Sequence, residues 1–266
     1  MRIGKKELTT EKKTYLMGIL NITPDSFSDG GKYMNISSAM TQVTRMIDQG
    51  VDIIDIGGES TRPGYLSISV EEEIARILPV IESIRKDYNI PISVDTTKPA
   101  VARETLLAGA DMINDISCLQ TLEMAMLVAE TGCSYCLMHN QQGTEYDDFM
   151  KDMLSTLRNA VGVLKEAGVQ DGQIVVDPGI GFAKTYEQNI EAIRQVDQLQ
   201  ELGYPILLGV SRKSVIGNTL LVPTGERMEG TLALSVYGAM KGCSIFRVHD
   251  VLENARALQM IEALIV

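Results

Sequence analysis

One pattern recurs along the chain: a helical period, a glycine, and then a short apolar run that ends in a polar residue. It is clearest in the segments IDQGVDIIDIGG, LLAGADMINDIS, AETGCSYCLMH and AMKGCSIFRVH. The glycines of these segments are Gly50, Gly109, Gly132 and Gly242. Each suits the left-handed residue that commonly ends a helix. Short apolar runs of this kind are typical of strands that are buried on both faces, as in parallel sheets.

Looser copies of the pattern fill the rest of the chain and predict eight strands, each followed by a helix. The strands are expected near 15–22, 51–57, 91–95, 112–116, 134–139, 174–178, 205–210 and 244–248. The helices are expected near 36–49, 70–88, 98–108, 120–131, 146–167, 186–202, 226–241 and 251–264. A spacing of about 33 residues per unit matches a (β/α)8 barrel of about 250 residues.

An open doubly wound sheet is the alternative α/β fold. The count of eight units and the absence of a second composition zone favour the barrel. We therefore predict a single (β/α)8 TIM-barrel domain over residues 1–266, with residues 1–13 as an extension before the first strand.

The helix expected near 226–241 contains LALSVYGAM, which is apolar nearly all round. A barrel helix with one buried face should instead be amphipathic. A second buried face is therefore expected, and a subunit interface is its simplest cause.

Composition narrows the function. The chain has 266 residues and a formal net charge of −11 at pH 7, which argues against general nucleic-acid binding because that needs a basic face. A small anion held by a few local cations remains compatible with this charge. The charged start MRIGKKELTTEKK does not read as a signal peptide, and no run of about 18 apolar residues is available to span a membrane. We expect a cytoplasmic protein with no membrane partner.

The four cysteines are Cys118, Cys133, Cys136 and Cys243. Without a secretion signal, free thiols are expected. Cys133 and Cys136 form a C-x-x-C, a spacing that also occurs in redox and zinc sites. The surrounding CSYCLMH reads as an apolar strand and histidine is scarce, so buried structural thiols are favoured.

Polar residues stand at nearly every expected strand end, which is the edge where barrel enzymes carry their active sites. They are Asn21, Asp55, Asp95, Asn114, Asp115, His139, Asp177, Ser211, Arg212, Lys213, Arg247 and His249. A single such residue is usually a helix cap. Eight strands that all end this way, with both histidines among them, indicate a functional rim.

The rim and its neighbouring loops divide by chemistry. The cationic groups are Arg62, Lys213, Arg247 and His249, and with Thr61 and Ser211 they suit a phosphate or diphosphate. Asp95, Asn114 and Asp177 mix donors with acceptors and suit a flat, nitrogen-rich heterocycle. Asn21, Asp25 and Asp29 offer oxygens of the kind that Mg²⁺ accepts beside substrate phosphates. The residues thus indicate a phosphorylated, nitrogen-rich small molecule and a divalent metal.

Seven segments together resemble the dihydropteroate synthases of folate biosynthesis: GILNITPDSFSDGG, DIGGESTRPG, ISVDT, INDIS, VVDPGIGF, GVSRKSVIG and FRVHDV. They occur in the order found in that family and cover almost the whole chain. The resemblance implies a transferase that joins p-aminobenzoate to 6-hydroxymethyl-7,8-dihydropterin diphosphate, with release of pyrophosphate and 7,8-dihydropteroate. It also implies Mg²⁺ as cofactor, a homodimer, and competition between sulfonamides and p-aminobenzoate.

The same resemblance assigns roles to individual positions. The pterin-binding set is Asp95, Asn114, Met138, Asp177, Phe182, Gly209, Lys213 and Arg247. The diphosphate set is Asn21, Thr61, Arg62, Arg247 and His249, with Asn21 on Mg²⁺ and Asp25 and Asp29 as further metal candidates. The p-aminobenzoate set is Phe27, Thr61, Pro63, Phe182, Lys213 and Ser214. The implied catalytic residues are Asp25, Asp29, Asp95, Asp177, Lys213 and Arg247.

Two positions depart from the family pattern. Ala183 and Gln188 stand where many members have Gly and His, and we expect the methyl group of Ala183 to be without effect. His139 lies in a segment that varies in the family, so it is left outside the site.

The loops expected at 22–35 and 58–70 are rich in Gly, Ser and Pro and are long enough to act as lids. An electron-rich dihydropterin can stabilise a cation on its methylene carbon, so a dissociative, SN1-like substitution is expected. Such an intermediate needs water kept out, which is the task we predict for the two loops.

Two alternatives share parts of this pattern. A methyltetrahydrofolate–corrinoid methyltransferase would share the pterin acids, but it has no need for the diphosphate cations or for TPDSFSDGG and SRK. An inactive pterin-binding homologue is the other, and the intact strand-end positions argue against it.

Overall fold

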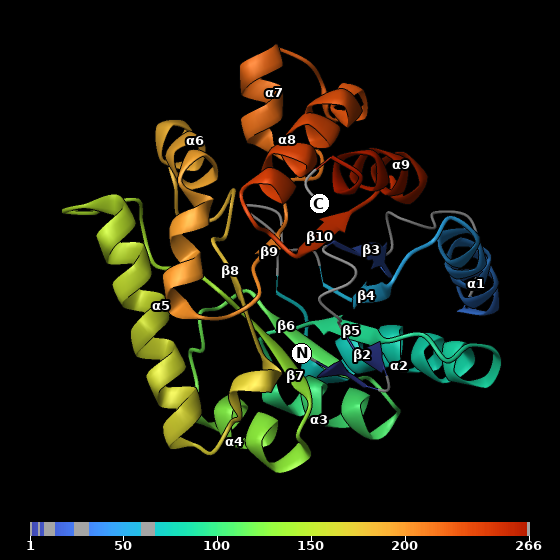
Figure 1. The fold of residues 1–266 in the computed structure, drawn as a ribbon. Coiled ribbons are helices and arrows are strands. Elements are labelled where there is room, and N and C mark those ends of the chain that lie inside the picture. Colours follow the sequence, from blue (N-terminus) through green and yellow to red (C-terminus); the bar gives the residue numbers. More distant parts are fainter. Residues whose placement is uncertain (1, 5, 8–13, 24–31, 60–66, 265–266) are drawn as a thin grey trace.

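The computed structural model describes residues 2–4, 6–7, 14–23, 32–59 and 67–264 (Figure 1). Eight parallel strands form its centre: β3 (Tyr15–Asn21), β4 (Ile53–Gly57), β5 (Ile92–Asp95), β6 (Met112–Asp115), β7 (Ser134–Met138), β8 (Ile174–Asp177), β9 (Leu207–Leu208) and β10 (Ile245–Val248). Their order is β8-β7-β6-β5-β4-β3-β10-β9. A parallel bridge between Val176 and Ile206 joins the two ends of this sheet, which confirms the predicted TIM barrel.

The helices follow the strands along the chain and surround them in space (Figure 1). They are α1 (Lys32–Asp48), α2 (Val70–Asp87), α3 (Pro99–Leu107), α4 (Leu122–Thr131), α5 (Phe149–Glu166), α6 (Tyr186–Arg194), α8 (Met228–Met240) and α9 (Val251–Glu262). The predicted helix near 186–202 is α6 followed by a 3₁₀ helix, η3 (Val196–Leu202). Within the described residues, no helix is both long enough and apolar enough to cross a membrane.

Besides the short 3₁₀ helices η2 (Asp171–Gln173) and η4 (Thr224–Glu226), an α-helix and a hairpin were not predicted. A short helix, α7 (Ser214–Leu220), lies between β9 and α8, and its seven residues are too few to show a clear helical period. A small antiparallel hairpin, β1 (Arg2–Ile3) with β2 (Lys6–Glu7), occupies part of the predicted N-terminal extension.

The four glycines of the repeated pattern have the expected conformation. Gly50, Gly109, Gly132 and Gly242 have φ values of 89°, 107°, 70° and 87°. All four lie in the left-handed region that side chains disfavour and glycine tolerates. The helix–glycine–strand pattern is therefore confirmed at its most specific point.

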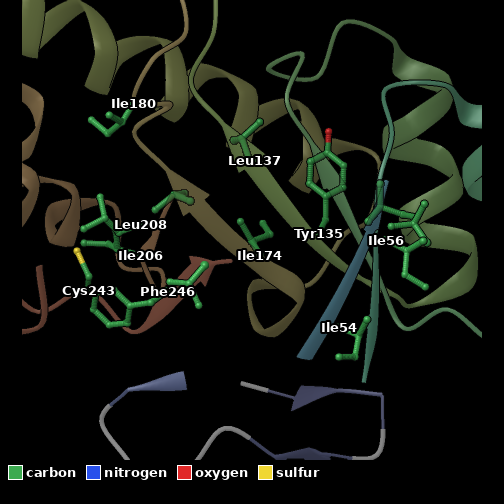
Figure 2. Packing of buried hydrophobic residues seen from close by; sticks show 14 of the residues in the cluster. Ile54, Ile56, Tyr135, Leu137, Ile174, Ile180, Ile206, Leu208, Cys243 and Phe246 are labelled. Atoms are coloured by element: carbon green, nitrogen blue, oxygen red, sulfur yellow. The ribbon is translucent and has the colours of Figure 1, made fainter. Parts of the chain in front are cut away.

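Two buried clusters hold the barrel together. The inner cluster fills the barrel with alternate residues of the strands, and Ile3 of the hairpin joins it: Ile3, Tyr15, Met17, Ile53, Met112, Cys136, Val175, Leu207 and Ile245. The outer cluster packs the other faces of the strands against the helices, and Figure 2 shows part of it, including Ile54, Ile56, Leu137 and Phe246. Because inward positions alternate along each strand, the strands also aim their last inward residues into the rim.

The cysteines are free thiols, as predicted. Cys133 and Cys136 are buried, and burial raises the pKa of the Cys133 thiol to about 11. Cys136 is part of the packed inner cluster. Both therefore act as small apolar side chains rather than as reactive groups.

Candidate functional site

Strand register places the first rim residues in one row. Asn21 pairs with Gly57, Gly57 with Asp95, and Asp95 with Asn114 across four neighbouring strands. Gly57 has no side chain between its neighbours. As a result, Asn21 Oδ1 and Asp95 Cβ each lie 3.6 Å from the point where a Cβ on Gly57 would be. On the other side of the barrel, Met138 pairs with Asp177 in the same way.

The centre of the site is an arginine held between two buried carboxylates. Arg247 Nε donates to Asp55 Oδ2 at 2.6 Å, and Arg247 Nη2 donates to Asp95 Oδ2 at 2.8 Å. Asn114 Nδ2 lies 3.4 Å from the same Asp55 oxygen. The three strands β4, β5 and β10 thus present one charge network to the rim.

Asp55 belongs to the predicted rim, but it is the residue of this network to which no binding or catalytic role was assigned. It is fully buried, and it fixes the guanidinium of Arg247 by a charge-assisted hydrogen bond. A signal for it was present in the sequence, because Asp55 interrupts the apolar run of β4 two positions before Gly57 and so shares its inward face.

A second group meets around Gly209, which directly follows β9. Asp177 Oδ2 and Lys213 Nζ each lie 3.7 Å from the point where a Cβ on Gly209 would be, and Arg247 Cβ lies 4.0 Å from it. Lys213 Nζ also donates to Ile180 O and lies 4.9 Å from the centroid of the Phe182 ring. Three of the predicted pterin residues therefore converge on this glycine, which is itself a predicted pocket-wall position.

Gly209→Ala should weaken pterin binding at least tenfold and leave the fold intact. The new methyl group would meet protein atoms at ordinary van der Waals distances, so no atom of the barrel must move. It would occupy space between Asp177 and Lys213 that a bound ring needs. The measurements are the dissociation constant of pteroic acid and the melting temperature.

Gly225→Ala is the matched control, because a Cβ at Gly225 meets nothing within 4 Å. An unchanged affinity in Gly209→Ala would show that the ring does not reach this part of the rim.

The turn before α7 aims Lys213 into the site. Arg212 has a left-handed φ of 56°, and its Nε and Nη2 donate to the two oxygens of Asp250 at 3.0 and 2.5 Å. Its backbone N–H donates to Thr231 Oγ1 at 3.0 Å, and its carbonyl accepts from Arg227 Nη1 at 2.9 Å. Arg212 is therefore committed to the turn, whereas the next residue, Lys213, points to Asp177.

Ser211 orients a histidine rather than standing alone for an anion. Its hydroxyl lies 2.9 Å from His249 Nδ1 and accepts the backbone N–H of His249 at 3.1 Å. Ser211 is buried, so it fixes the imidazole of His249 directly after β10, two residues beyond Arg247. Among the described residues the hydrogen bonds of the Ser211 hydroxyl go to His249, and its predicted part in phosphate binding stays a prediction.

Burial moves the pKa values of several ionisable groups in this site toward neutral pH. Burial raises the pKa of Asp95 to about 7, while Arg247 opposes the shift. Burial also raises the pKa of Asp177, with Lys213 acting against it. The pKa of Lys213 is lowered to about 8 by burial, and Asp177 opposes that change. A site with such perturbed groups is typical of a functional centre.

Several buried polar atoms in the rim have no hydrogen-bond partner among the described residues. They include Asp55 Oδ1, Asp95 Oδ1 and Ser93 Oγ. Leaving a buried polar group without a partner costs about 1–3 kcal/mol. A ligand with N–H donors would remove that cost at the two carboxylates.

The remaining predicted residues are placed as follows. Met138 is buried at the end of β7, Phe182 is partly exposed, and Ser214 is exposed at the first position of α7. Outside the described residues lie Asp25, Phe27, Asp29, Thr61, Arg62 and Pro63. The lid predictions for loops 22–35 and 58–70 fall largely on that part of the chain and stay predictions.

The described ends of the second loop are tied together. Glu59 Oε1 accepts the backbone N–H of Ile68 at 2.6 Å. Lys98 Nζ donates to Glu59 Oε1 at 3.2 Å, to Ile68 O at 3.0 Å and to the buried Glu73 at 2.7 Å. A lysine on the β5–α3 connection therefore sets where this loop leaves and re-enters the barrel.

Comparison with known proteins decides the family. Residues 17–249 match the description of pterin binding enzymes. The chain belongs to the pterin-binding enzyme family. A relative, the dihydropteroate synthase of Clostridium beijerinckii, is 53% identical over 267 residues, which cover 100% of this chain and 99% of the relative.

Solved structures of pterin-binding enzymes agree with this assignment. A dihydropteroate synthase from Clostridium difficile, crystallised in the presence of pteroic acid, has a TM-score of 0.93 and 46% identity, covering 100% of this chain and 99% of that chain. A dihydropteroate synthase from Xanthomonas albilineans with 4-aminobenzoic acid has a TM-score of 0.90 and 38% identity. The match covers 94% of this chain and 93% of that chain.

The two departures from the pattern of pterin-binding enzymes have visible local roles. Ala183 has a left-handed φ of 45°, a conformation that glycine would adopt with less strain. Gln188 completes a capping box with Thr185 at the start of α6 and donates to Thr144 O at 3.0 Å. Gln188 is therefore a structural residue of the helix start.

The part of the chain that the structure describes contains no group of three His, Cys, Asp or Glu that could hold a metal. Mg²⁺ usually keeps several water ligands and takes one or two protein oxygens together with substrate phosphates. The amide oxygen of Asn21, at the end of β3, fits that sparse requirement.

Proposed function

We propose that this pterin-binding enzyme is a dihydropteroate synthase. It joins p-aminobenzoate to 6-hydroxymethyl-7,8-dihydropterin diphosphate and releases pyrophosphate and 7,8-dihydropteroate. One observation carries the proposal: buried Asp95, Asn114 and Asp177 share one rim with the cations Lys213 and Arg247. The relatives named as dihydropteroate synthases, with pteroic acid or 4-aminobenzoic acid in their structures, support the choice of substrates.

The two carboxylates and the amide of this rim are suited to bind the pterin through hydrogen bonds. A pterin offers several N–H donors along one edge, and carboxylates can accept them. The buried oxygens of Asp95 and Asp177, with the amide of Asn114 beside Asp95, provide acceptors and a donor at the rim of the barrel. Lys213 supplies a donor next to Asp177, and Met138, Phe182 and Gly209 are proposed as the pocket walls.

The cations are suited to the diphosphate. Arg247 lies on β10 and His249 directly follows that strand, and Arg62 and Thr61 are proposed to join them from the second loop. Forked arginine hydrogen bonds match phosphate oxygens. Asn21 would hold Mg²⁺, with Asp25 and Asp29 as further candidates. Bound there, the metal would neutralise charge on the leaving diphosphate.

The substitution proceeds by dissociation before attack. The bond between the methylene carbon and the diphosphate oxygen breaks, and its electron pair stays with the diphosphate. Arg247 and His249 stabilise that negative charge, while Asp95 and Asp177 stabilise the positive charge that spreads into the pterin ring. The amine nitrogen of p-aminobenzoate then forms the new bond to the methylene carbon and gives up a proton to solvent.

We propose that p-aminobenzoate binds over Lys213 and Phe182. The other residues proposed around it are Phe27, Thr61, Pro63 and Ser214. Since sulfonamides resemble p-aminobenzoate in shape and charge, they should compete for the same place. The loops at 22–35 and 58–70 are proposed to exclude water during the reaction.

Further parts of the proposal concern the whole protein. We propose that residues 1–266 form one domain and that the protein is a homodimer. The apolar side chains of α8 that remain partly exposed support the dimer. They include Leu232, Leu234 and Val236, and Met240 is 63% exposed. The free thiols suit the reducing cytoplasm, where we place the protein.

A coupled assay for pyrophosphate tests the function. Release should require both p-aminobenzoate and the pterin diphosphate, and it should fall when Mg²⁺ is removed by a chelator. Pterin binding without pyrophosphate release would identify an inactive homologue instead. Methyl transfer from methyltetrahydrofolate to a corrinoid would contradict the proposal.

A further inference from the structure

The turn after β8 contains a lysine to which the proposed reaction gives no role. Lys184 Nζ lies 2.9 Å from His139 Nδ1, 3.1 Å from Gly179 O and 3.1 Å from Phe182 O. An ammonium group has three N–H donors and no acceptor. When Lys184 is protonated, the three neighbours use all of its donors, and His139 then accepts at Nδ1 with its own proton on Nε2.

This arrangement is costly for folding. Burial lowers the pKa of Lys184 to about 7, and Asp177 opposes that shift at longer range. Its three hydrogen-bond partners are a ring nitrogen and two carbonyl oxygens, so none of them carries a compensating negative charge. Nε2 of the fully buried His139 has no partner among the described residues. A hydrophobic side chain of similar volume would remove the cost of the buried charge, but it would leave His139 Nδ1 and the two carbonyl oxygens without this donor.

The turn that Lys184 holds carries part of the pterin site. Its two carbonyl partners bracket residues 179–182, which a hydrogen bond from Phe182 N to Gly179 O closes at 3.1 Å. Gly179 N donates to Asp177 Oδ1 at 2.6 Å. Within the same turn, Ile180 O accepts from Lys213 Nζ.

Three groups of the site therefore depend on one side chain. The acceptor Asp177, the donor Lys213 and the ring of Phe182 all contact or belong to the turn that Lys184 fixes. His139 anchors the lysine from the end of β7, so the ammonium also ties two neighbouring strand ends together.

We propose that Lys184 is a positioning residue of the pterin site, whose ammonium fixes the turn at 179–182 and through it Asp177, Phe182 and Lys213. It touches neither substrate nor reacting atoms. The inference rests on the proposed function for the identity of the ligand, but the ordering of the turn is a property of the free protein.

Lys184→Met tests this role because it removes the ammonium with little change in volume. In the ligand-free variant, the amides of Gly179 and Phe182 should exchange with solvent at least tenfold faster. The KM for the pterin diphosphate should rise at least tenfold, and the KM for p-aminobenzoate should rise as well, because Phe182 and Lys213 also belong to the proposed p-aminobenzoate site. The melting temperature should fall only slightly, because relief of the buried charge offsets part of the loss of three hydrogen bonds. Lys151→Met, at a side chain that is 83% exposed, should leave all four quantities unchanged.

The outcomes separate this role from the proposed function. Unchanged amide exchange in the turn overturns the inference, whether or not the protein binds a pterin. Faster amide exchange throughout the barrel, rather than at Gly179 and Phe182, would show a general structural role and would also overturn it. A parent protein that fails to bind the pterin diphosphate contradicts the proposed function, and amide exchange then decides on Lys184 alone. If Lys184→Met does not fold, Lys184→Gln, which keeps two N–H donors, should show smaller changes in the same direction.

Discussion

Asp95→Ala should lower turnover at least about a hundredfold and leave the barrel folded. The carboxylate lies at the end of β5, is paired with Arg247 at 2.8 Å, and has a second buried oxygen with no partner among the described residues. In the proposed reaction it accepts pterin N–H groups and stabilises positive charge as the C–O bond breaks. Removing one oriented charge or donor from comparable sites costs about 2.7–4 kcal/mol in the transition state.

The measurement is pyrophosphate release at saturating substrates, together with the melting temperature. Arg247 keeps its bond to Asp55 in the variant, so its charge stays paired and the fold should survive. Asp87→Ala, at an exposed carboxylate at the end of α2, is the control and should behave like the parent. Turnover of Asp95→Ala within threefold of the parent would remove Asp95 from the mechanism.

The raised pKa of Asp95 also predicts the direction in which the affinity for a pterin changes with pH. A pKa of about 7 means that Asp95 is mostly protonated at pH 6 and mostly ionised at pH 8. The ionised form is the better acceptor, so affinity for a pterin should rise over this interval. Asp95→Asn cannot ionise and should lack this rise. Because titration of the ligand affects both proteins equally, the ratio of the two affinities at each pH isolates Asp95.

Much of this site was accessible from the sequence because parallel strands make position predictable. Once β4 and β5 are recognised as strands of one barrel, their last inward residues must meet at one rim. Asn21, Asp95 and Asn114 were predicted on that basis, and the strand register places them side by side. The glycine pattern could be predicted for a similar reason, because a helix that ends in a left-handed residue favours glycine at that position.

The sequence did not predict in the same way which side chains form hydrogen bonds or ion pairs with one another. Arg212 and Lys213 are adjacent cations of similar reach, yet one pairs with Asp250 and the other enters the site. The left-handed φ of Arg212 decides this, and backbone geometry at one residue leaves no trace in hydrophobic periodicity. The same limit hid the role of Ser211 as the hydrogen-bond partner of His249.

The missed elements have a related cause. The seven residues of α7 and the two-residue strands of the N-terminal hairpin are too short for a period to be read. Their formation depends on contacts with distant parts of the chain, such as Ile3 in the inner barrel cluster. Such contacts override local propensity, which is weak over a few residues.

Lys213→Ala should also lower turnover at least about a hundredfold. Lys213 Nζ is brought close to Asp177 and the Phe182 ring, and it donates to Ile180 O. Its loss removes the pterin-side cation and leaves Asp177 without its nearest opposing charge. Lys165→Ala, at a half-exposed lysine of α5 paired with Asp171, is the control and should keep parental turnover.

The lowered pKa of Lys213 predicts where its contribution ends. With a pKa of about 8, the ammonium deprotonates as the pH rises through 8, whereas an ordinary lysine would stay charged to about pH 10. Parental turnover should therefore fall on the alkaline side of pH 8, and Lys213→Arg, which stays charged, should not show this fall even if its rate is lower throughout. Turnover of Lys213→Ala within threefold of the parent, or an alkaline limb that persists in Lys213→Arg, would contradict the assigned role. The alkaline limb thus separates the charge of Lys213 from its shape, because the arginine keeps the charge and changes only the shape.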